Sequence, residues 1–222
     1  MDTAGLTSVR RRLALAAARS GRDASDVTLV VVTKGRSIEE TMVLYEAGHR
    51  DFGENRPEEL ATKAPQLPAD IIWHMVGTVQ RRKVPLAASY TSLLHSLDRE
   101  ALARSWAGLD DPPAALVQVN VASEPRKHGV DTTDVASLVA MSEALGVTVA
   151  GLMVIPPIPE VPESSRRWFE RARSLRDEVA VDHPAVAELS MGMTDDFEVA
   201  IESGSTLIRV GRAIFEIGAD TA

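Results

Sequence analysis

The chain has 222 residues, 45% of them hydrophobic, and a formal net charge of −8. This length suits one domain of the barrel or open-sheet kind, and the dispersed acidic charge argues against a nucleic-acid binder that relies on phosphate contacts. Cysteine is absent, which excludes disulfides, a thiolate nucleophile and cysteine-bound metals, and fits a reducing cytoplasm.

The first predicted element is an amphipathic, arginine-rich helix over 5–19, which ends near Gly21. A transit peptide is the alternative interpretation of this segment. We favour the helix because it leads directly into the first apolar strand. No apolar stretch of the sequence approaches the roughly 20 residues that a membrane helix needs.

Short apolar runs follow at regular intervals, each long enough for a buried strand and too short for a core helix. They predict strands at 28–33, 51–54, 71–76, 91–95, 115–121, 148–153, 186–190 and 206–210.

Longer helical segments separate these runs. They predict helices near 37–48, 57–63, 79–88, 99–106, 131–145, 163–180 and 195–203, with a short last helix after Gly211.

Eight near-continuously apolar strands, each followed by a helix, indicate the fold class. They predict an α/β protein, a single TIM-type (β/α)8 barrel over residues 1–222, with the extra N-terminal helix before the first strand. A doubly wound open sheet is the competing architecture. Its dinucleotide-binding version is disfavoured because no G-x-G-x-x-G motif follows a strand.

Polar residues lie at the ends of several predicted strands, where a barrel of this type carries its chemistry. Lys34 closes the first apolar run, and a lysine there is either a solvated terminus or an amine that forms a Schiff base with an aldehyde. Arg209 interrupts the last strand, where an arginine either pairs with a carboxylate or faces a ligand. The strand-end residues are Lys34, Asn55, His74, His95, Asn120, Met153, Ser190, Arg209 and Gly211.

The segments after the seventh and eighth strands together indicate a phosphate site. Gly192 permits a tight turn, and Thr194 or Asp195 can cap the following helix, whose free amides can hold an anion. Gly211 lets the backbone approach a ligand closely where the last short helix begins. Each segment alone would be an ordinary strand-to-helix turn, but barrels often bind phosphate between these two loops.

In a closed barrel the first strand neighbours the eighth, so Lys34, Arg209 and the phosphate loops converge. A phosphorylated aldehyde with a ring nitrogen would satisfy all three features, and pyridoxal 5′-phosphate (PLP) is such a molecule.

Distinctive motifs run in order over nearly the whole chain, among them Phe-Gly-Glu-Asn at 52–55 and Ser-Met-Gly-Met at 190–193. They resemble those of the pyridoxal phosphate homeostasis protein family, the single-domain relatives of the alanine racemase barrel. The matching segments are 32–34, 52–55, 73–77, Gln80 with Lys83, 127–130, 151–156, 167–169, 189–196 and 204–215.

The resemblance implies a cofactor-binding role for seven residues. Lys34 would bear PLP as a Schiff base, and Arg209 would face the pyridine nitrogen. The remaining implied contacts are to the phosphate, from Thr194 and the backbone amides of Gly211 and Arg212, and to the ring, from Ser190 and Asn55.

Three positions depart from the family pattern. Arg212 stands where threonine or serine is usual, so a hydroxyl contact to phosphate is lost, although the backbone amide remains and the guanidinium could contact phosphate itself. Arg82 replaces a commoner asparagine, and Glu216 replaces the usual glycine after Ile-Phe. Thr194 in place of serine keeps the hydroxyl.

The resemblance implies a PLP carrier or buffer in intracellular vitamin B6 homeostasis, without strong catalysis. The residues favour the same interpretation, because a cation such as Arg209 beside the pyridine nitrogen disfavours its protonation and makes the ring a poorer electron sink. The second base of an alanine racemase is a tyrosine, and neither Tyr45 nor Tyr90 lies at a predicted strand end. We interpret His74 and His95 as hydrogen-bonded structural residues.

Two other functions stay open. One is a weak PLP-dependent amino-acid racemase or related enzyme, and the other is a phosphosugar-binding barrel in which Lys34 reacts with a substrate aldehyde. We expect PLP, PLP-dependent apoenzymes or free amino acids as partners of a monomer, and no nucleic acid, membrane or metal. The proline-rich segment 155–162 is either a stiff connector or a wall over the site.

Overall fold

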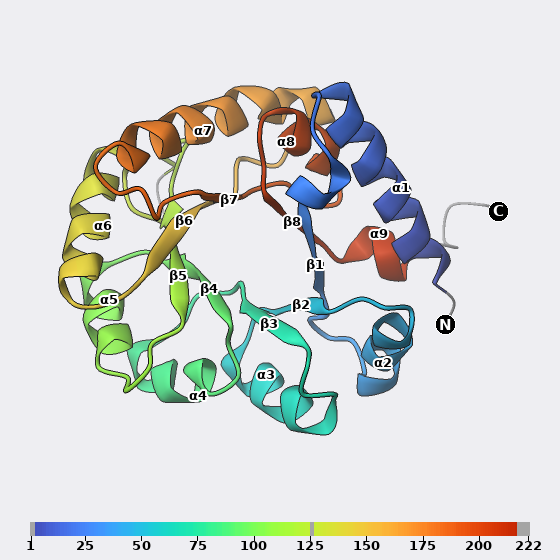
Figure 1. Cartoon of the computed structure of the whole chain (residues 1–222), viewed down its shortest axis with the longest axis horizontal. Coiled ribbons are helices and arrows are strands. Elements are labelled where there is room, and N and C mark those ends of the chain that lie inside the picture. The colour runs from blue at the N-terminus through green and yellow to red at the C-terminus, as the bar shows by residue number, and fades with distance from the viewer. Residues whose placement is uncertain (1–2, 125–126, 217–222) are drawn as a thin grey trace.

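The computed structural model describes residues 3–124 and 127–216. Eight parallel strands close into a barrel in sequence order, with β1 paired to β8, and helices surround the barrel (Figure 1). This confirms the predicted fold class and excludes the open sheet. The strands are β1 (Thr28–Val32), β2 (Asp51–Glu54), β3 (Ile72–Met75), β4 (Leu93–Leu97), β5 (Ala114–Val119), β6 (Val149–Val154), β7 (Glu188–Ser190) and β8 (Leu207–Val210).

The extra helix α1 (Ala4–Arg19) forms as predicted and packs beside α8 (Phe197–Glu202) and α9 (Arg212–Phe215), next to the point where the barrel closes (Figure 1). Within the described part of the chain, no helix is long and apolar enough to cross a membrane. The helices are α1 (Ala4–Arg19), α2 (Ile38–Glu46), α3 (Pro57–Lys63), α4 (Val84–Ala88), α5 (Glu100–Ala107), α6 (Val135–Ala144), α7 (Arg166–Ala180), α8 (Phe197–Glu202) and α9 (Arg212–Phe215).

The helix predicted at 79–88 is wrong in its first half. The chain instead forms a 3-10 turn over Arg81–Lys83, and α4 begins only at Val84. A continuous helix would place Pro85 in its interior, where proline lacks an N–H and clashes with the preceding turn. In the observed structure Pro85 lies in the first turn of α4, where both costs are avoided.

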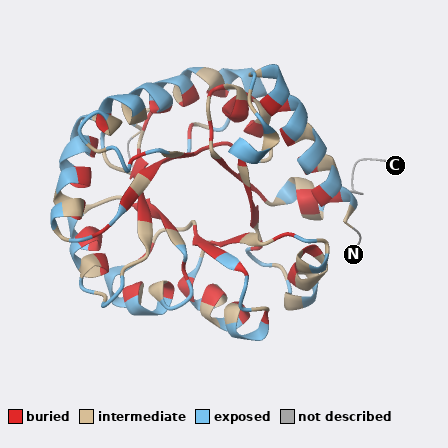
Figure 2. Cartoon of the chain, viewed as in Figure 1, coloured by how far each residue is buried: buried red, intermediate tan, exposed pale blue. Residues whose placement is uncertain are grey.

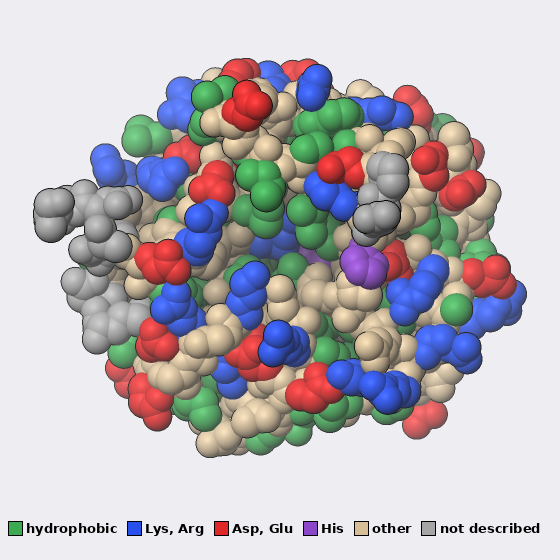
Figure 3. All heavy atoms as spheres, turned by 180° about the vertical axis from the view of Figure 1, so that it is seen from behind, with side chains coloured by type: hydrophobic (Ala, Val, Ile, Leu, Met, Phe, Trp, Pro, Cys, Tyr) green, Lys and Arg blue, Asp and Glu red, His purple; other side chains and the backbone are tan. Residues whose placement is uncertain are grey.

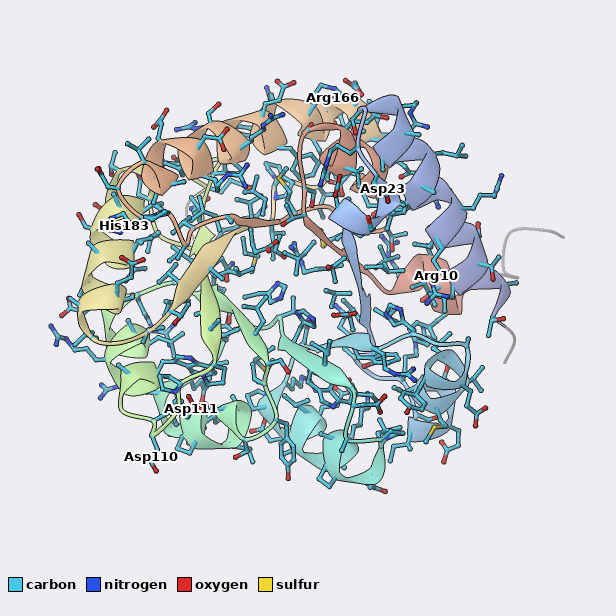
Figure 4. All side chains as sticks on the ribbon, viewed as in Figure 1. Arg10, Asp23, Asp110, Asp111, Arg166 and His183 are labelled. Carbon is cyan, nitrogen blue, oxygen red and sulfur yellow. The ribbon has the colours of Figure 1, made fainter. Side chains whose placement is uncertain are left out.

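Burial follows the two faces of each strand. Figure 2 shows buried residues along the strands and on the inner faces of the helices, while the outer helix faces are exposed. The apolar layer between strands and helices includes Val31, Phe52 and Leu152, each with no exposed surface. Side chains also fill the interior of the barrel (Figure 4), so the barrel is a packed core rather than a channel.

Candidate functional site

A cavity of about 390 Å³ opens at the carboxyl ends of the strands, within the range of roughly 300–1,000 Å³ that is typical of small-molecule sites. Figure 3 shows this face, where Lys and Arg side chains border a central hollow. The lining residues lie in seven different strands or near their carboxyl ends, as expected for a barrel site. They are Val32, Lys34, Asn55, Val76, Gly77, Thr78, Gln118, His128, Ile155, Met193, Thr194, Asp195, Arg209, Gly211 and Arg212.

Six of the seven predicted cofactor-binding residues line this single cavity: Lys34, Asn55, Thr194, Arg209, Gly211 and Arg212. Sequence reasoning missed Gln118 and His128. Gln118 is a nearly buried polar residue in the apolar strand β5, and that interruption of the apolar run was the signal that could have identified it. His128 belongs to a recognised motif but was given no role.

Lys34 differs from the other lysines of the chain in its partners. The sequence holds four lysines, and three of them are paired with carboxylates: Lys63 with Glu54 and Glu59, Lys83 with Glu58, and Lys127 with Glu124. Among the described residues, no hydrogen bond or salt bridge joins the Lys34 Nζ atom to a neighbour. Lys34 therefore offers an amine with no competing partner to whatever occupies the cavity.

A buried ion cluster lies beneath the turn that carries Lys34. Lys63 Nζ donates three hydrogen bonds of 2.7 Å, to the Thr33 carbonyl, to Glu54 Oε1 and to Glu59 Oε1. Burial raises the pKa of Glu54, while the hydrogen bonds from Lys63 and Thr33 oppose that rise. We call Glu54, Glu59 and Lys63 the turn anchor.

The turn anchor holds both neighbours of Lys34. The Thr33 side chain donates to Glu54 Oε1 at 2.7 Å, and the Gly35 backbone N–H donates to Glu59 Oε1 at 2.6 Å. The α2 helix then starts immediately, because Ser37 and Glu40 form a capping box. The backbone of Lys34 is thus fixed on both sides while its side chain stays free.

The loop after β7 differs in one detail from the prediction. Because α8 begins at Phe197, the residue before it is Asp196, and neither Thr194 nor Asp195 caps the helix. Thr194 instead joins the two loops, since its Oγ1 atom lies 3.4 Å from the backbone N–H of Ala213 and accepts from it. The loops after β7 and β8 are therefore adjacent at the cavity, as a shared phosphate site requires.

Arg212 is engaged rather than free. Its guanidinium donates to the carboxylate of Asp195 across the two loops, and both residues line the cavity. Beside it, a Cβ atom on Gly211 would lie 3.1 Å from the Val32 carbonyl oxygen. The glycine thus keeps the backbone of this loop close to β1 and to the Lys34 turn.

Gly192 provides the sharp turn of the first loop, with a φ angle of +95°. A Cβ atom there would lie 2.5 Å from Ala200 Cβ, whereas a Cβ on Gly21, with φ +70°, would meet nothing within 4 Å. We expect Gly192→Ala to lower the free energy of unfolding by about 1–3 kcal/mol more than Gly21→Ala, since both carry the positive-φ strain but only the first adds a clash. Urea denaturation of the two variants measures this difference, and equal losses would contradict it.

Arg209 is buried in β8 and still lines the cavity. Its Nη1 atom donates to Ser190 Oγ at 2.5 Å and its Nη2 atom donates to the Val154 carbonyl at 3.0 Å. Burial lowers its pKa to about 10, so the guanidinium remains charged at neutral pH. In the described residues no carboxylate forms a salt bridge with it, which favours the ligand-facing alternative of the two considered for this arginine.

Ser190 is the exception among the seven. It has no exposed surface and lies behind Arg209, bonded to it, rather than among the residues that line the cavity. The reason is the strand geometry, because Ser190 is the last residue of β7 and points into the barrel interior. Ser190 thus contacts Arg209 directly, and its place near a bound ring stays a prediction.

The histidines and tyrosines lie away from the cavity, except His128. His74 and His95 lie inside strands β3 and β4 and bond to each other at 2.9 Å. Tyr45 donates to Asp70 at 2.8 Å, and neither tyrosine is among the lining residues. From the proline-rich segment, only Ile155 lines the cavity, and Ile158 is 92% exposed.

The sequence has clear relatives among known proteins. Residues 6–218 match the family described as alanine racemase, N-terminal domain. The chain is 37% identical over 218 residues to the pyridoxal phosphate homeostasis protein of Aquifex aeolicus, covering 95% of each chain. It is 34% identical over 226 residues to the protein of that name from Escherichia coli, covering 95% of this chain and 94% of the relative.

Solved structures of similar proteins have the same fold as this chain. A protein from Bifidobacterium adolescentis superposes with a TM-score of 0.88 at 32% identity, covering 96% of this chain and 94% of that one. PipY of Synechococcus elongatus, solved with PLP bound, superposes with a TM-score of 0.78 at 33% identity, covering 93% and 99%. An alanine racemase from Corynebacterium glutamicum shares the fold, with a TM-score of 0.72 at 14% identity. The chain therefore belongs to the pyridoxal phosphate homeostasis protein family, whose barrel is that of the alanine racemase N-terminal domain.

Proposed function

We propose that this chain binds PLP, holds it as a Schiff base on Lys34, and acts as a monomeric carrier or buffer in intracellular vitamin B6 balance. The observation that carries the proposal is the cavity itself, which brings together an unpaired lysine amine, a buried arginine and two adjacent glycine loops. The names of the relatives and the PLP-bound PipY structure support it.

The residues present fit each chemical group of PLP. When bound, PLP supplies an aldehyde, and the Lys34 amine would add to it with loss of one water as the C=N bond forms. The Arg209 guanidinium can only donate a hydrogen bond, which suits an unprotonated pyridine nitrogen. Thr194 and the backbone of Gly211 stand at the paired loops, where the phosphate would lie.

The same residues favour holding the cofactor over strong catalysis. Arg209 keeps its positive charge at neutral pH, with a pKa of about 10, and a neighbouring cation disfavours protonation of the ring nitrogen. The described lining residues also include no tyrosine that could serve as a second base. Both features weaken carbanion chemistry at a substrate α-carbon.

One observation favours the second candidate, a weak PLP-dependent amino-acid racemase or related enzyme. His128 lines the cavity, and its Nδ1 atom lies 3.5 Å from Asp98 Oδ2, a geometry that can orient an imidazole base. Turnover of a panel of amino acids by the PLP-loaded protein, with Lys34→Ala as the control, separates the two functions. The carrier proposal predicts no Lys34-dependent turnover, and turnover at ordinary enzyme rates would overturn it.

Arg209→Glu is expected to restore protonation of the bound ring nitrogen. A carboxylate in place of the guanidinium would raise the pH at which the cofactor spectrum changes by about 1–3 units. Arg209→Gln, which keeps a donor without the charge, should give an intermediate shift, and Arg82→Glu, outside the cavity, should give none. Absorbance titration of folded, PLP-loaded variants measures the shift, and an unchanged Arg209→Glu spectrum would count against Arg209 as the ring partner.

A further inference from the structure

A line of hydrogen bonds crosses the barrel interior beneath the cavity. Arg209 Nη1 lies 2.5 Å from Ser190 Oγ, which lies 2.8 Å from His95 Nδ1. His95 Nε2 lies 2.9 Å from His74 Nδ1, and His74 Nε2 lies 3.2 Å from Asp51 Oδ1. We call these five residues the core chain. Its members come from β8, β7, β4, β3 and β2, so it joins strands on opposite sides of the barrel.

The hydrogen positions along the core chain follow from its ends. A guanidinium only donates, so Ser190 Oγ accepts from Arg209 and its own hydrogen is left to donate to His95 Nδ1. His95 then carries its hydrogen on Nε2 and donates to His74. His74 in turn carries its hydrogen on Nε2 and donates to Asp51. Every donor points the same way, from the arginine to the carboxylate.

Burial supports the neutral His95 imidazole that this order requires. His95 has no exposed surface, and desolvation, with the nearby Arg209 and His74, lowers its pKa well below the usual value. His95, at the centre of the core chain, is thus uncharged at neutral pH. Aligned hydrogen bonds of this kind polarise one another in a low-dielectric interior.

The two ends lie on opposite faces of the barrel. Arg209 lines the cavity at the carboxyl ends of the strands. Asp51 is the first residue of β2, its side chain is 27% exposed, and it lines a separate pocket on the amino-terminal face with Arg10 and His49. Among the described residues, no carboxylate forms a salt bridge with Arg209. The core chain instead connects its guanidinium to the carboxylate of Asp51 through three intervening side chains.

We propose that Ser190, His95, His74 and Asp51 are positioning residues for Arg209. They fix the orientation of the guanidinium plane relative to the cavity. Because Ser190 accepts from one N–H group of Arg209, the hydrogen-bond order also determines which N–H group stays free to donate to a ligand nitrogen. The part of the proposal that concerns a bound ring rests on the proposed function. The tautomers and the hydrogen-bond order are properties of the protein alone.

The first test uses the cofactor-free protein and nitrogen-15 NMR of the histidine rings. We expect His95 and His74 to be neutral at pH 7, each with its hydrogen on Nε2 and a protected, downfield N–H signal. Asp51→Ala, at the partly exposed end, should remove the protected signal of His74 and leave that of His95. A hydrogen on Nδ1 of either ring, or a cationic ring at pH 7, would overturn the core chain.

The second test compares PLP binding by His95→Leu and His95→Gln. Glutamine can accept from Ser190 and donate to His74, so we expect its dissociation constant and absorbance maximum to stay close to those of the wild type. Leucine breaks the chain between Ser190 and His74, and we expect roughly tenfold weaker binding, the equivalent of one net hydrogen bond, with a displaced absorbance maximum. His183→Leu, which removes an imidazole paired with Glu143 at the outer layer (Figure 4), is the matched control.

The outcomes separate the two proposals. A glutamine variant as weak as the leucine variant would contradict a positioning role, even if both remain folded. A protein that binds no PLP but shows the predicted tautomers would retain the core chain and refute the proposed function. If His95→Leu does not fold, the Asp51→Ala spectrum and the glutamine variant still decide the matter.

Discussion

Lys63→Met is expected to lower the free energy of unfolding by about 3–5 kcal/mol, the cost of leaving one member of a buried ion pair alone. The Lys63 side chain is 6% exposed and that of Glu54 is fully buried. Glu54 Oε2 has no hydrogen-bond partner among the described atoms. The hydrogen bonds to Oε1 must therefore offset the whole desolvation cost of burying this carboxylate. Without the ammonium group, Glu54 must be buried as an unpaired charge or take up a proton.

If Glu54 takes up a proton in Lys63→Met, the stability of this variant depends on pH, and the sign of that dependence can be derived. Burial already raises the pKa of Glu54 in the folded protein, and losing Lys63 raises it further. A group with a raised folded pKa favours the folded state most at low pH, and this contribution is lost as the pH rises through the folded pKa. The deficit of Lys63→Met should therefore shrink as the pH is lowered toward the unfolded pKa of a glutamate.

Urea denaturation at pH 7 and at lower pH measures both effects. Lys63→Met with Glu54→Gln should recover about half of the loss or more, because the uncompensated charge is gone. The matched control is Lys83→Met, whose partner Glu58 is half exposed and whose loss should be about 0–1 kcal/mol. Equal losses in the single and double variants would show that the lysine stem, rather than its charge, stabilises this region.

Lys34→Ala is expected to abolish the visible absorbance and the borohydride-reducible adduct of the PLP-loaded protein. Among the described residues that line the cavity, Lys34 carries the only primary amine able to form the C=N bond, whereas Arg209 and the two loops remain to bind the phosphorylated ring weakly. Absorbance and equilibrium dialysis of PLP measure the two effects separately.

Lys83→Ala serves as the control for Lys34→Ala, because it removes a lysine that pairs with Glu58 outside the cavity. This variant should keep the full visible band. Retention of a reducible adduct at full occupancy by Lys34→Ala would refute the assignment of the Schiff-base lysine.

The sequence predicted the barrel well because each strand is a near-continuous apolar run, which a parallel sheet buried on both faces requires. The eight strands were located to within about two residues. Lys34, Arg209 and Gly211 were also found, since a charged or glycine residue at the end of such a run stands out. Each of these signals comes from residues adjacent in the sequence, so a single sequence is enough to recognise it.

The features that were missed depend on contacts between distant segments. The turn anchor joins Lys63 to Thr33, 30 positions apart, through the geometry of α3 over β2. The bond between His95 and Ser190 spans 95 positions and the width of the barrel. His95 was placed at a strand end because β4 was predicted to stop there, but the strand continues to Leu97 and turns the imidazole into the core.

Borohydride reduction of the PLP-loaded wild-type protein, followed by peptide mapping by mass spectrometry, tests the central claim most directly. The sequence has only four lysines, so the modified residue can be assigned without ambiguity. We expect one pyridoxyl group per chain, on Lys34. Modification of Lys63, Lys83 or Lys127 instead, or no modification at all, would contradict it.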